Sequence, residues 1–195
     1  MASAIDRSET LFSGKFLSCR KIYYTDAKGV ARHWEAVDRT GSSGEAHAVF
    51  AVAKIVPDNE LVLVRQFRPP AGRLMVEFPA GLIDAGESAA ETAIRELYEE
   101  TGFVGKVIYC TKGGYSSPGM TGESIVLASM EIDGSSYPDG MLPENHQEEC
   151  ENIEVFRVKI NDLPAFIQQM EAAGCGIDSK IYTVLAFQNS GAIDG

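Results

Sequence analysis

Three glutamates at helical spacing are the residues of this chain best placed to do chemistry. Glu96, Glu99 and Glu100 are separated by three and four residues in a stretch whose pattern predicts a helix. Residues at these spacings share one helix face, and their like charges repel unless a cation lies among them. Carboxylate oxygens are preferred ligands of Mg²⁺ and Mn²⁺. The spacing therefore predicts a site for a divalent cation and, through it, for a pyrophosphate group.

The helix that carries these glutamates has both ends marked in the sequence. Ser88 and Glu91 have the spacing of a capping box, and Gly102 stands where a helix favours a left-handed C-terminal residue. The preceding loop, 78–87, contains glycines that let backbone carbonyls and Glu87 approach the same metals. An apolar stripe on the helix is predicted to pack on the core. Its members are Ala90, Ala93, Ile94, Leu97 and Thr101.

Loop and helix together resemble a complete Nudix box. The matching positions are Gly81, Glu87, Arg95-Glu96-Leu97, Glu99-Glu100 and Gly102-Phe103. The resemblance implies hydrolysis of a nucleoside diphosphate linked to another group, X, which the box leaves open. It also implies that Glu96, Glu100 and the backbone carbonyl of Ala80 ligate the metals. Glu99 or Glu87 is expected to assist.

Segments outside the box resemble the ADP-ribose and ADP-sugar pyrophosphatases of this family. In the run 32–40, Trp34 is the only tryptophan of the chain and stands in the position of a residue that stacks on adenine. The resemblance implies that Glu35 bonds the edge of the base and that Arg39 helps to hold the adenosine end. The run 64–70, with 77–82, is similar to the segment before the box. This resemblance implies that Arg68 contacts the diphosphate and that Leu82 is one of the substrate-binding residues.

Two positions depart from the animal enzymes of this branch. The loop 116–121 is similar to a proline-glycine loop that touches the terminal ribose, but Ser117 stands where those enzymes carry an acidic residue. The group X could therefore differ from ribose. Phe16 stands where a second stacking tryptophan would be, and phenylalanine offers a smaller ring for an aromatic sandwich around adenine.

The resemblance places a catalytic glutamate on a loop before the last strand. Glu151 aligns best with it, Glu148 and Glu149 remain candidates, and an acidic loop without a catalytic residue is the alternative. Attack of water on phosphorus requires proton removal, and a carboxylate can assist once a metal has lowered the pKa of the water. Arg95 is either a phosphate ligand or a counter-ion that orients a glutamate, and we favour the counter-ion.

Composition limits the class of protein and its partners. With 195 residues, 45% of them hydrophobic, the chain can form one core with a small appendage. A net charge of −11 argues against nucleic-acid binding, which needs a basic surface. The cysteines and histidines are scattered without the spacing of a disulfide framework or a metal site. No apolar run reaches the length of a membrane span, so we expect a location in the cytosol or nucleus.

Alternating runs at 15–24 and 30–40 around a turn predict a hairpin in an N-terminal antiparallel β domain, residues 1–44. Residues 45–195 are predicted to form the Nudix domain, an α/β fold arranged as an α/β/α sandwich with a mixed sheet. Its expected strands are 48–56, 61–66, 106–111, 124–132 and 153–158, and its further helices are 162–173 and 179–189. The resemblance implies a homodimer with a shared active site, in which Trp34 and Glu35 complete the site of the partner.

These observations predict a Mg²⁺-dependent hydrolase, with Mn²⁺ as an alternative cofactor. The expected reaction cleaves the pyrophosphate of ADP-ribose, or of a related ADP-sugar, to AMP and a sugar phosphate such as ribose 5-phosphate. Alternatives are a Nudix hydrolase for 8-oxo-dGDP, a UDP-sugar or NADH, and an inactive module that binds ADP-ribose. The intact set of carboxylates argues against the inactive module.

Overall fold

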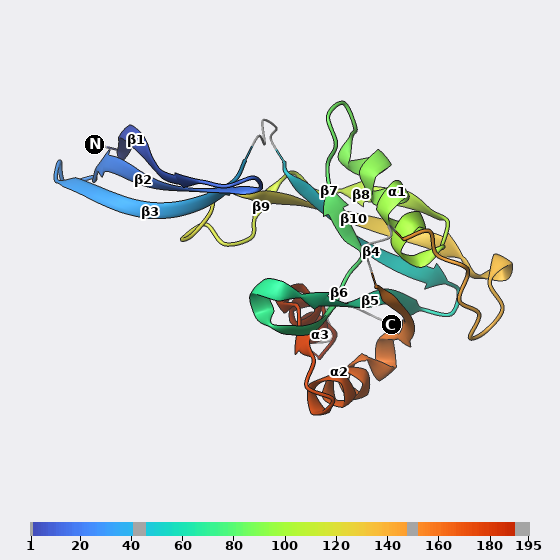
Figure 1. Ribbon diagram of the computed structural model, residues 1–195. Helices are drawn as coiled ribbons and strands as arrows, with labels where there is room; N and C mark the ends of the chain where they lie inside the picture. Colours follow the sequence, from blue (N-terminus) through green and yellow to red (C-terminus); the bar gives the residue numbers. More distant parts are fainter. Residues whose placement is uncertain (1, 41–45, 148–151, 190–195) are drawn as a thin grey trace. The chain divides into compact units, whose positions relative to one another are not determined.

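The chain divides into two compact units. The computed structural model describes residues 2–40, 46–147 and 152–189 (Figure 1). The smaller unit takes its described residues from 1–47 and 112–125, and the larger from 48–111 and 126–195. The sequence had assigned 112–125 to the larger domain, and the predicted boundary between residues 44 and 45 stays a prediction.

An antiparallel sheet in the order β1-β2-β3 forms the smaller unit. The strands are β1 (Ala4–Ser13), β2 (Leu17–Thr25) and β3 (Ala31–Arg39). Asp26 closes the β2-β3 turn by accepting hydrogen bonds from the backbone N–H groups of Lys28 and Val30, each at 2.9 Å. The predicted hairpin is confirmed. β1 was not predicted, because its polar residues show no clear alternation with apolar ones.

A mixed sheet runs in the order β12-β6-β5-β4-β10-β8. β12 is parallel to β6, and the pairs β6-β5, β5-β4 and β10-β8 are antiparallel. β11 pairs with β5, β7 with β4, and β9 with the start of β10. The strands are β4 (Ala48–Val56), β5 (Glu60–Arg68), β6 (Arg73–Glu77), β7 (Ala80–Leu82), β8 (Gly105–Cys110), β9 (Gly114–Tyr115), β10 (Ser124–Asp133), β11 (Glu154–Lys159) and β12 (Gly176–Ile177).

Different helices pack against different strands of this sheet. The helix α1 (Ala89–Thr101) contacts β4, β7 and β8, whereas α2 (Leu163–Ala172) contacts β11 and β12. Figure 1 shows α2 and α3 (Ser179–Asn189) beside β5 and β6. Residues 61–64 of β5 are all buried, as expected for a strand that is covered on both faces. The short 3₁₀ helices are η1 (Pro69–Ala71), η2 (Gly134–Ser136) and η3 (Ile160–Asp162).

The predicted α/β/α sandwich is therefore confirmed, and the predicted strands and helices agree with the structure to within two residues at most of their ends. β6 and β7 were not predicted, because they are short and separated by Phe78 and Pro79. In the part of the chain that the structure describes, no helix has the length and apolar character needed to cross a membrane.

Candidate active site

The ends of α1 are formed as the sequence predicts. Ser88 Oγ accepts a hydrogen bond from the Glu91 backbone N–H at 3.3 Å, and the Ser88 N–H donates to Glu91 Oε2 at 2.9 Å. At the other end Gly102 has φ of +74° and donates to the carbonyl of Tyr98 at 2.7 Å. These caps determine where the helix begins and ends. They therefore fix which residues belong to the helix.

The buried stripe of α1 differs in part from the prediction. Ala93, Leu97 and Thr101 are fully buried, as expected, but Ile94 is 42% exposed. Glu100 is only 3% exposed, so the stripe extends toward it rather than toward Ile94. The prediction for Ile94 was wrong because apolar spacing alone does not show how wide a face the sheet covers. A carboxylate therefore lies at the buried edge of the helix.

Arg95 holds the other glutamates of the box. Its Nε and Nη2 donate to the two carboxylate oxygens of Glu87 at 3.0 and 2.9 Å. Nη1 donates to Glu96 Oε1 at 2.8 Å and to Glu99 Oε2 at 3.0 Å, and Nη2 also reaches the carbonyl of Leu82 at 3.3 Å. This arrangement is typical of a guanidinium that orients carboxylates by paired hydrogen bonds. It supports the counter-ion interpretation of Arg95.

These contacts keep the site ionised. The hydrogen bonds from Arg95 lower the pKa of Glu87 from 4.5 to about 2, and the Thr92 hydroxyl, which donates to Glu87 at 2.7 Å, acts in the same direction. The pKa of Arg95 is raised by the same pairing. Both groups are therefore charged at neutral pH. A metal ion would meet a deprotonated carboxylate at Glu87.

The backbone of β7 comes unusually close to α1. The Ala80 N–H donates to Glu100 Oε2 at 3.2 Å. A Cβ atom placed on Gly81 would lie 1.8 Å from Glu96 Oε1, far inside van der Waals contact. Only glycine allows the Glu96 carboxylate to take this position. Glu96 and Glu100 therefore face one short segment of backbone at Ala80 and Gly81.

The donor set fits a divalent cation, although the structure does not show a formed cage. Among the residues that the structure describes, no three His, Cys, Asp or Glu side chains converge as metal ligands would. The carboxylates point instead to Arg95 and to the β7 backbone. Glutamate side chains rotate easily at their terminal torsion, so Glu96 and Glu100 can turn toward a cation beside Gly81. Their roles, and that of the Ala80 carbonyl, stay predictions.

Arg68 lies at the end of β5, where its Nε donates to Glu77 Oε2 at 2.8 Å. Burial raises the pKa of Glu77, and the charge of Arg68 opposes that shift. The Arg68 side chain is 41% exposed, so it is partly open to a ligand from solvent. Its predicted contact to a diphosphate stays a prediction, as does the substrate contact of Leu82, an exposed residue of β7.

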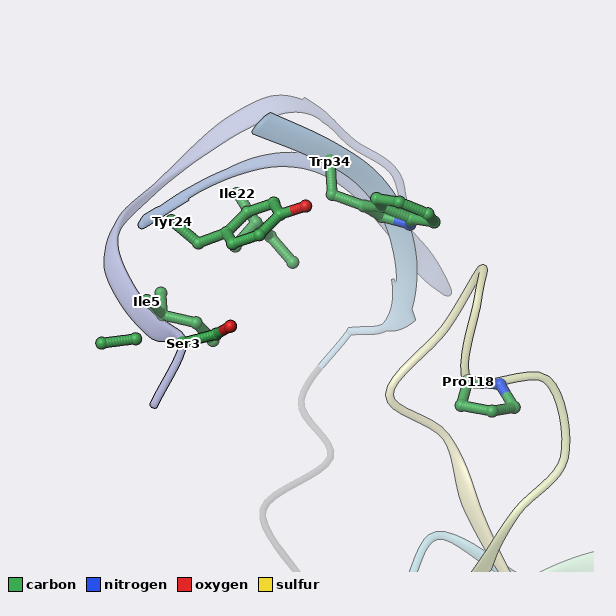
Figure 2. A pocket seen from close by; sticks show the side chains of 7 residues that line it. Ser3, Ile5, Ile22, Tyr24, Trp34 and Pro118 are labelled. Atoms are coloured by element: carbon green, nitrogen blue, oxygen red, sulfur yellow. The ribbon is translucent and has the colours of Figure 1, made fainter. Parts of the chain in front are cut away.

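In the smaller unit, Trp34 lines a half-open pocket of about 250 Å³ (Figure 2). Its indole N–H donates to the carbonyl of Gly119 at 2.9 Å, which ties β3 to the loop 116–121. The pocket is lined by Ser3, Ala4, Ile5, Ile22, Tyr24, Trp34 and Pro118. Figure 2 shows the aromatic rings of Tyr24 and Trp34 on the neighbouring strands. A flat apolar ring could stack here on one side.

The sequence analysis did not assign Tyr24 to the pocket, although the two-residue alternation of side chains along a strand is a signal for it. Ile22 lies directly opposite Trp34 in the β2-β3 register, and Tyr24 shares the Ile22 face because it is two residues further along the strand. Every second residue of β2 lies on the same face as Trp34, so Ile22 and Tyr24 could have been assigned to the pocket once the register was known.

Other predicted substrate residues lie away from this pocket. Glu35 follows Trp34 in β3 and so points to the opposite face of the sheet. Arg39 forms a salt bridge with Glu123, with 2.5 Å between Nε and Oε1. Phe16 accepts a hydrogen bond from the Thr40 N–H, six residues beyond Trp34, which corresponds to about 20 Å along a strand. The aromatic sandwich of Trp34 and Phe16 is therefore not formed within one chain.

Ser117 lies in the loop that meets Trp34. Its backbone carbonyl accepts hydrogen bonds from the N–H groups of Met120 and Thr121 at 2.9 and 3.0 Å, which closes a turn.

The candidate bases Glu148, Glu149 and Glu151 lie outside the described residues, so the assignment of Glu151 stays a prediction.

Comparison with known proteins agrees with the geometry of α1. A family model of the NUDIX domain matches residues 45–173, which include the whole glycine, arginine and glutamate pattern described above. The chain belongs to the Nudix family. The chain is therefore a Nudix hydrolase.

The relatives of this chain include proteins that are named for an activity. The ADP-ribose pyrophosphatase of Saccharomyces cerevisiae is 36% identical over 176 residues, which cover 87% of this chain and 75% of that protein. The ADP-sugar pyrophosphatase of Mus musculus is 33% identical over 186 residues, which cover 91% and 84%. A crystal structure of an ADP compounds hydrolase superposes with a TM-score of 0.66 at 18% identity, covering 99% of this chain and 98% of that one. This superposition confirms the fold.

Proposed function

We propose that this Nudix hydrolase cleaves the pyrophosphate bond of ADP-ribose, or of a related ADP-sugar, with Mg²⁺ as cofactor. The expected products are AMP and a sugar phosphate such as ribose 5-phosphate. The observation that carries the proposal is the approach of Glu96 and Glu100 to the backbone at Ala80 and Gly81, with Arg95 as the counter-ion of Glu96. The yeast and mouse relatives, named for ADP-ribose and ADP-sugar, support this substrate class.

Each residue of the site has a separate task in this proposal. Glu96 and Glu100 would hold the metal, and Arg95 would keep Glu96 oriented through its 2.8 Å hydrogen bond. A bound Mg²⁺ supplies positive charge to the phosphate oxygens and lowers the pKa of water; Mn²⁺ could replace it. Arg68 would bind the diphosphate, and Glu151 would accept the proton of the attacking water.

Local positive charge is needed at the site because the chain and its proposed substrate are both negatively charged. The net charge of −11 repels a nucleotide diphosphate at long range. Arg95 is already paired with glutamates, so it adds little attraction for phosphate. Binding should therefore depend strongly on the divalent cation.

We also propose that the Trp34 pocket binds the adenine base. Its apolar and aromatic lining suits a planar base, and Trp34, one of the lining residues, is 51% exposed to solvent. Ser117, in the adjoining loop, would face the sugar end without an acidic contact. A sugar other than ribose is therefore compatible with the site.

A homodimer is the proposed active form. The sheet of the smaller unit and its β1-β2 turn leave about half or more of the surface of several large apolar residues exposed, which is typical of an interaction surface. These residues are Ile5, Leu11, Phe12, Phe16 and Leu17. Light scattering should therefore give about twice the mass of the 21.1 kDa chain. A mass equal to that of one chain would contradict the dimer and leave the proposed reaction untouched.

Product analysis tests the reaction and its substrate class. We expect the protein with Mg²⁺ to release AMP and ribose 5-phosphate faster from ADP-ribose than it turns over ADP-glucose, UDP-glucose, NADH or 8-oxo-dGDP. Trp34→Ala should raise KM for ADP-ribose by about 5- to 150-fold, because base stacking on an aromatic ring contributes about 1–3 kcal/mol. Tyr23→Ala is the matched control, because Tyr23 is on the opposite face of the same sheet.

The outcomes separate the candidate functions. Faster turnover of UDP-glucose or 8-oxo-dGDP would keep the metal site but remove the adenine assignment of Trp34. Binding of ADP-ribose without turnover of any of these compounds would identify an inactive binding module instead.

A further inference from the structure

Lys180 of α3 lies close to the strand that borders the candidate metal site. Its ammonium is 5.3 Å from the centre of the Phe50 ring, a distance typical of a cation–π contact. Phe50 of β4 pairs directly with Ala80 in the β4-β7 register. The N–H of Ala80 in turn donates to the Glu100 carboxylate. A cation of α3 therefore contacts the residue next to the backbone that the carboxylates of α1 approach.

The parallel strands β6 and β12 place two acidic residues side by side. Val76 pairs with Ile177 in their register, so the next residues, Glu77 and Asp178, lie at the carboxyl ends of neighbouring strands. The Asp178 N–H donates to the carbonyl of Val76 at 3.0 Å, which continues the pairing beyond β12. Two carboxylates are therefore available at this end of the sheet to hold cations.

Each of these carboxylates holds one cation and leaves some of its donors open. Arg68 Nε donates to Glu77 Oε2 at 2.8 Å. Lys180 Nζ donates to Asp178 Oδ2 at 2.6 Å. Within the described part of the chain, the Nη1 and Nη2 groups of Arg68 and two of the three ammonium N–H groups of Lys180 meet no further acceptor. The two side chains are 41% and 34% exposed, so a ligand can reach these donors from solvent.

The charges of both cations act on the same carboxylate. Burial raises the pKa of Glu77, and the positive charges of Arg68 and Lys180 oppose that shift. Asp178 acts in the direction of burial. Because such interactions weaken with distance, both cations lie near Glu77. Two anchored cations near one carboxylate can bind neighbouring oxygens of one polyanion.

We propose that Lys180 is a substrate-binding residue, which joins Arg68 in binding the oxygens of the diphosphate. The inference rests on the proposed function, in which Arg68 binds this group. Glu77 and Asp178 hold the two side chains before the substrate arrives, so less conformational freedom is lost on binding. The open N–H groups then donate charge-assisted hydrogen bonds to phosphate oxygens. Arg95 differs from this pair, because all three of its guanidinium nitrogens already donate to glutamates.

Steady-state kinetics with ADP-ribose and Mg²⁺ give the first test. Lys180→Met keeps a long side chain but removes the ammonium. We expect KM to rise about tenfold with kcat within about twofold of the wild type, because the lost hydrogen bond is made to bound substrate and transition state alike. Lys180→Arg keeps the charge and should stay within about threefold of the wild-type KM.

Lys106→Met is the matched control for the change in net charge. Lys106 forms an exposed ion pair with Glu131, so its substitution also removes one positive charge that is paired with a carboxylate. We expect the wild-type KM for this variant. A KM for Lys180→Met within about twofold of the wild type would overturn the inference, and so would an equal rise in Lys106→Met.

A third variant separates substrate binding from a structural role of the ion pair. Asp178 Oδ1 accepts a hydrogen bond from the Lys180 backbone N–H at 2.7 Å, so this side chain also caps the start of α3. Asp178→Asn keeps the cap and the ammonium but removes the ion pair. We expect its KM to stay within about threefold of the wild type. An equal rise in KM in Asp178→Asn and Lys180→Met would assign Lys180 to the stability of α3 and would overturn the inference.

Binding of inorganic pyrophosphate supplies a readout that does not depend on turnover. Calorimetric titration with pyrophosphate and Mg²⁺ should give a Kd about tenfold higher for Lys180→Met than for the wild type, and an unchanged Kd for Lys106→Met. Equal Kd values for the wild type and Lys180→Met, or no binding by the wild type, would overturn the inference. The expected weakening in a protein that hydrolyses none of the tested nucleotides would instead locate the failure in the proposed function.

Discussion

Glu100→Gln is expected to lower kcat for ADP-ribose by about 10³-fold. The substitution removes a charge from a carboxylate that is 3% exposed and that meets the backbone of Ala80. A metal ligand contributes several kcal/mol to the transition state, and each 1.36 kcal/mol is about tenfold in rate. A glutamine oxygen can still accept from the Ala80 N–H, so α1 should remain packed on β7.

Measurement of AMP release at increasing Mg²⁺ concentration, together with thermal unfolding, checks this expectation. Glu99→Gln is the matched control, since its side chain is 42% exposed and it is predicted only to assist. We expect a loss of less than tenfold for it. A rate for Glu100→Gln within tenfold of the wild type would remove Glu100 from the metal ligands, provided that the variant folds.

Arg95→Met should lower kcat/KM by about 10²-fold. Arg95 is the shared hydrogen-bond donor of Glu87, Glu96 and Glu99, and residues that orient metal ligands typically affect activity by about 10–100-fold. Excess Mg²⁺ should not restore the rate, because the variant loses the orientation of the carboxylates and not their charge. Arg95→Lys keeps the positive charge without the planar fork and should be intermediate.

The same variant has a pH-dependent effect on stability. Pairing with Arg95 lowers the pKa of Glu87 from 4.5 to about 2 in the folded protein, so its contribution is fully present above pH 4.5 and is lost as pH falls through about 2. The difference in Tm between wild type and Arg95→Met should therefore be largest above pH 4.5 and shrink as the pH approaches 2. Thermal unfolding between pH 6 and pH 2 measures it. A difference that is constant with pH would show that Arg95 stabilises the fold by packing alone.

Features of α1 that depend on neighbouring residues were predictable from the sequence. The capping box at Ser88 and the left-handed Gly102 were both confirmed, because a cap involves residues three or four apart. The prediction for Ile94 was wrong, because its exposure depends on which strands cover the helix. The strands β1 and β6 were not predicted, because their local pattern is weak and their pairing with β2 and β5 defines them.

The sequence by itself determined the family, the divalent-metal chemistry and the helix face that carries Glu96, Glu99 and Glu100, because helix geometry relates residue spacing directly to direction. Only the tertiary structure decided that Glu100 is buried and that a side chain at Gly81 would displace Glu96. It alone separated Trp34 from Phe16 within one chain. These contacts depend on sheet register and on how loops close, which no local period in the sequence encodes.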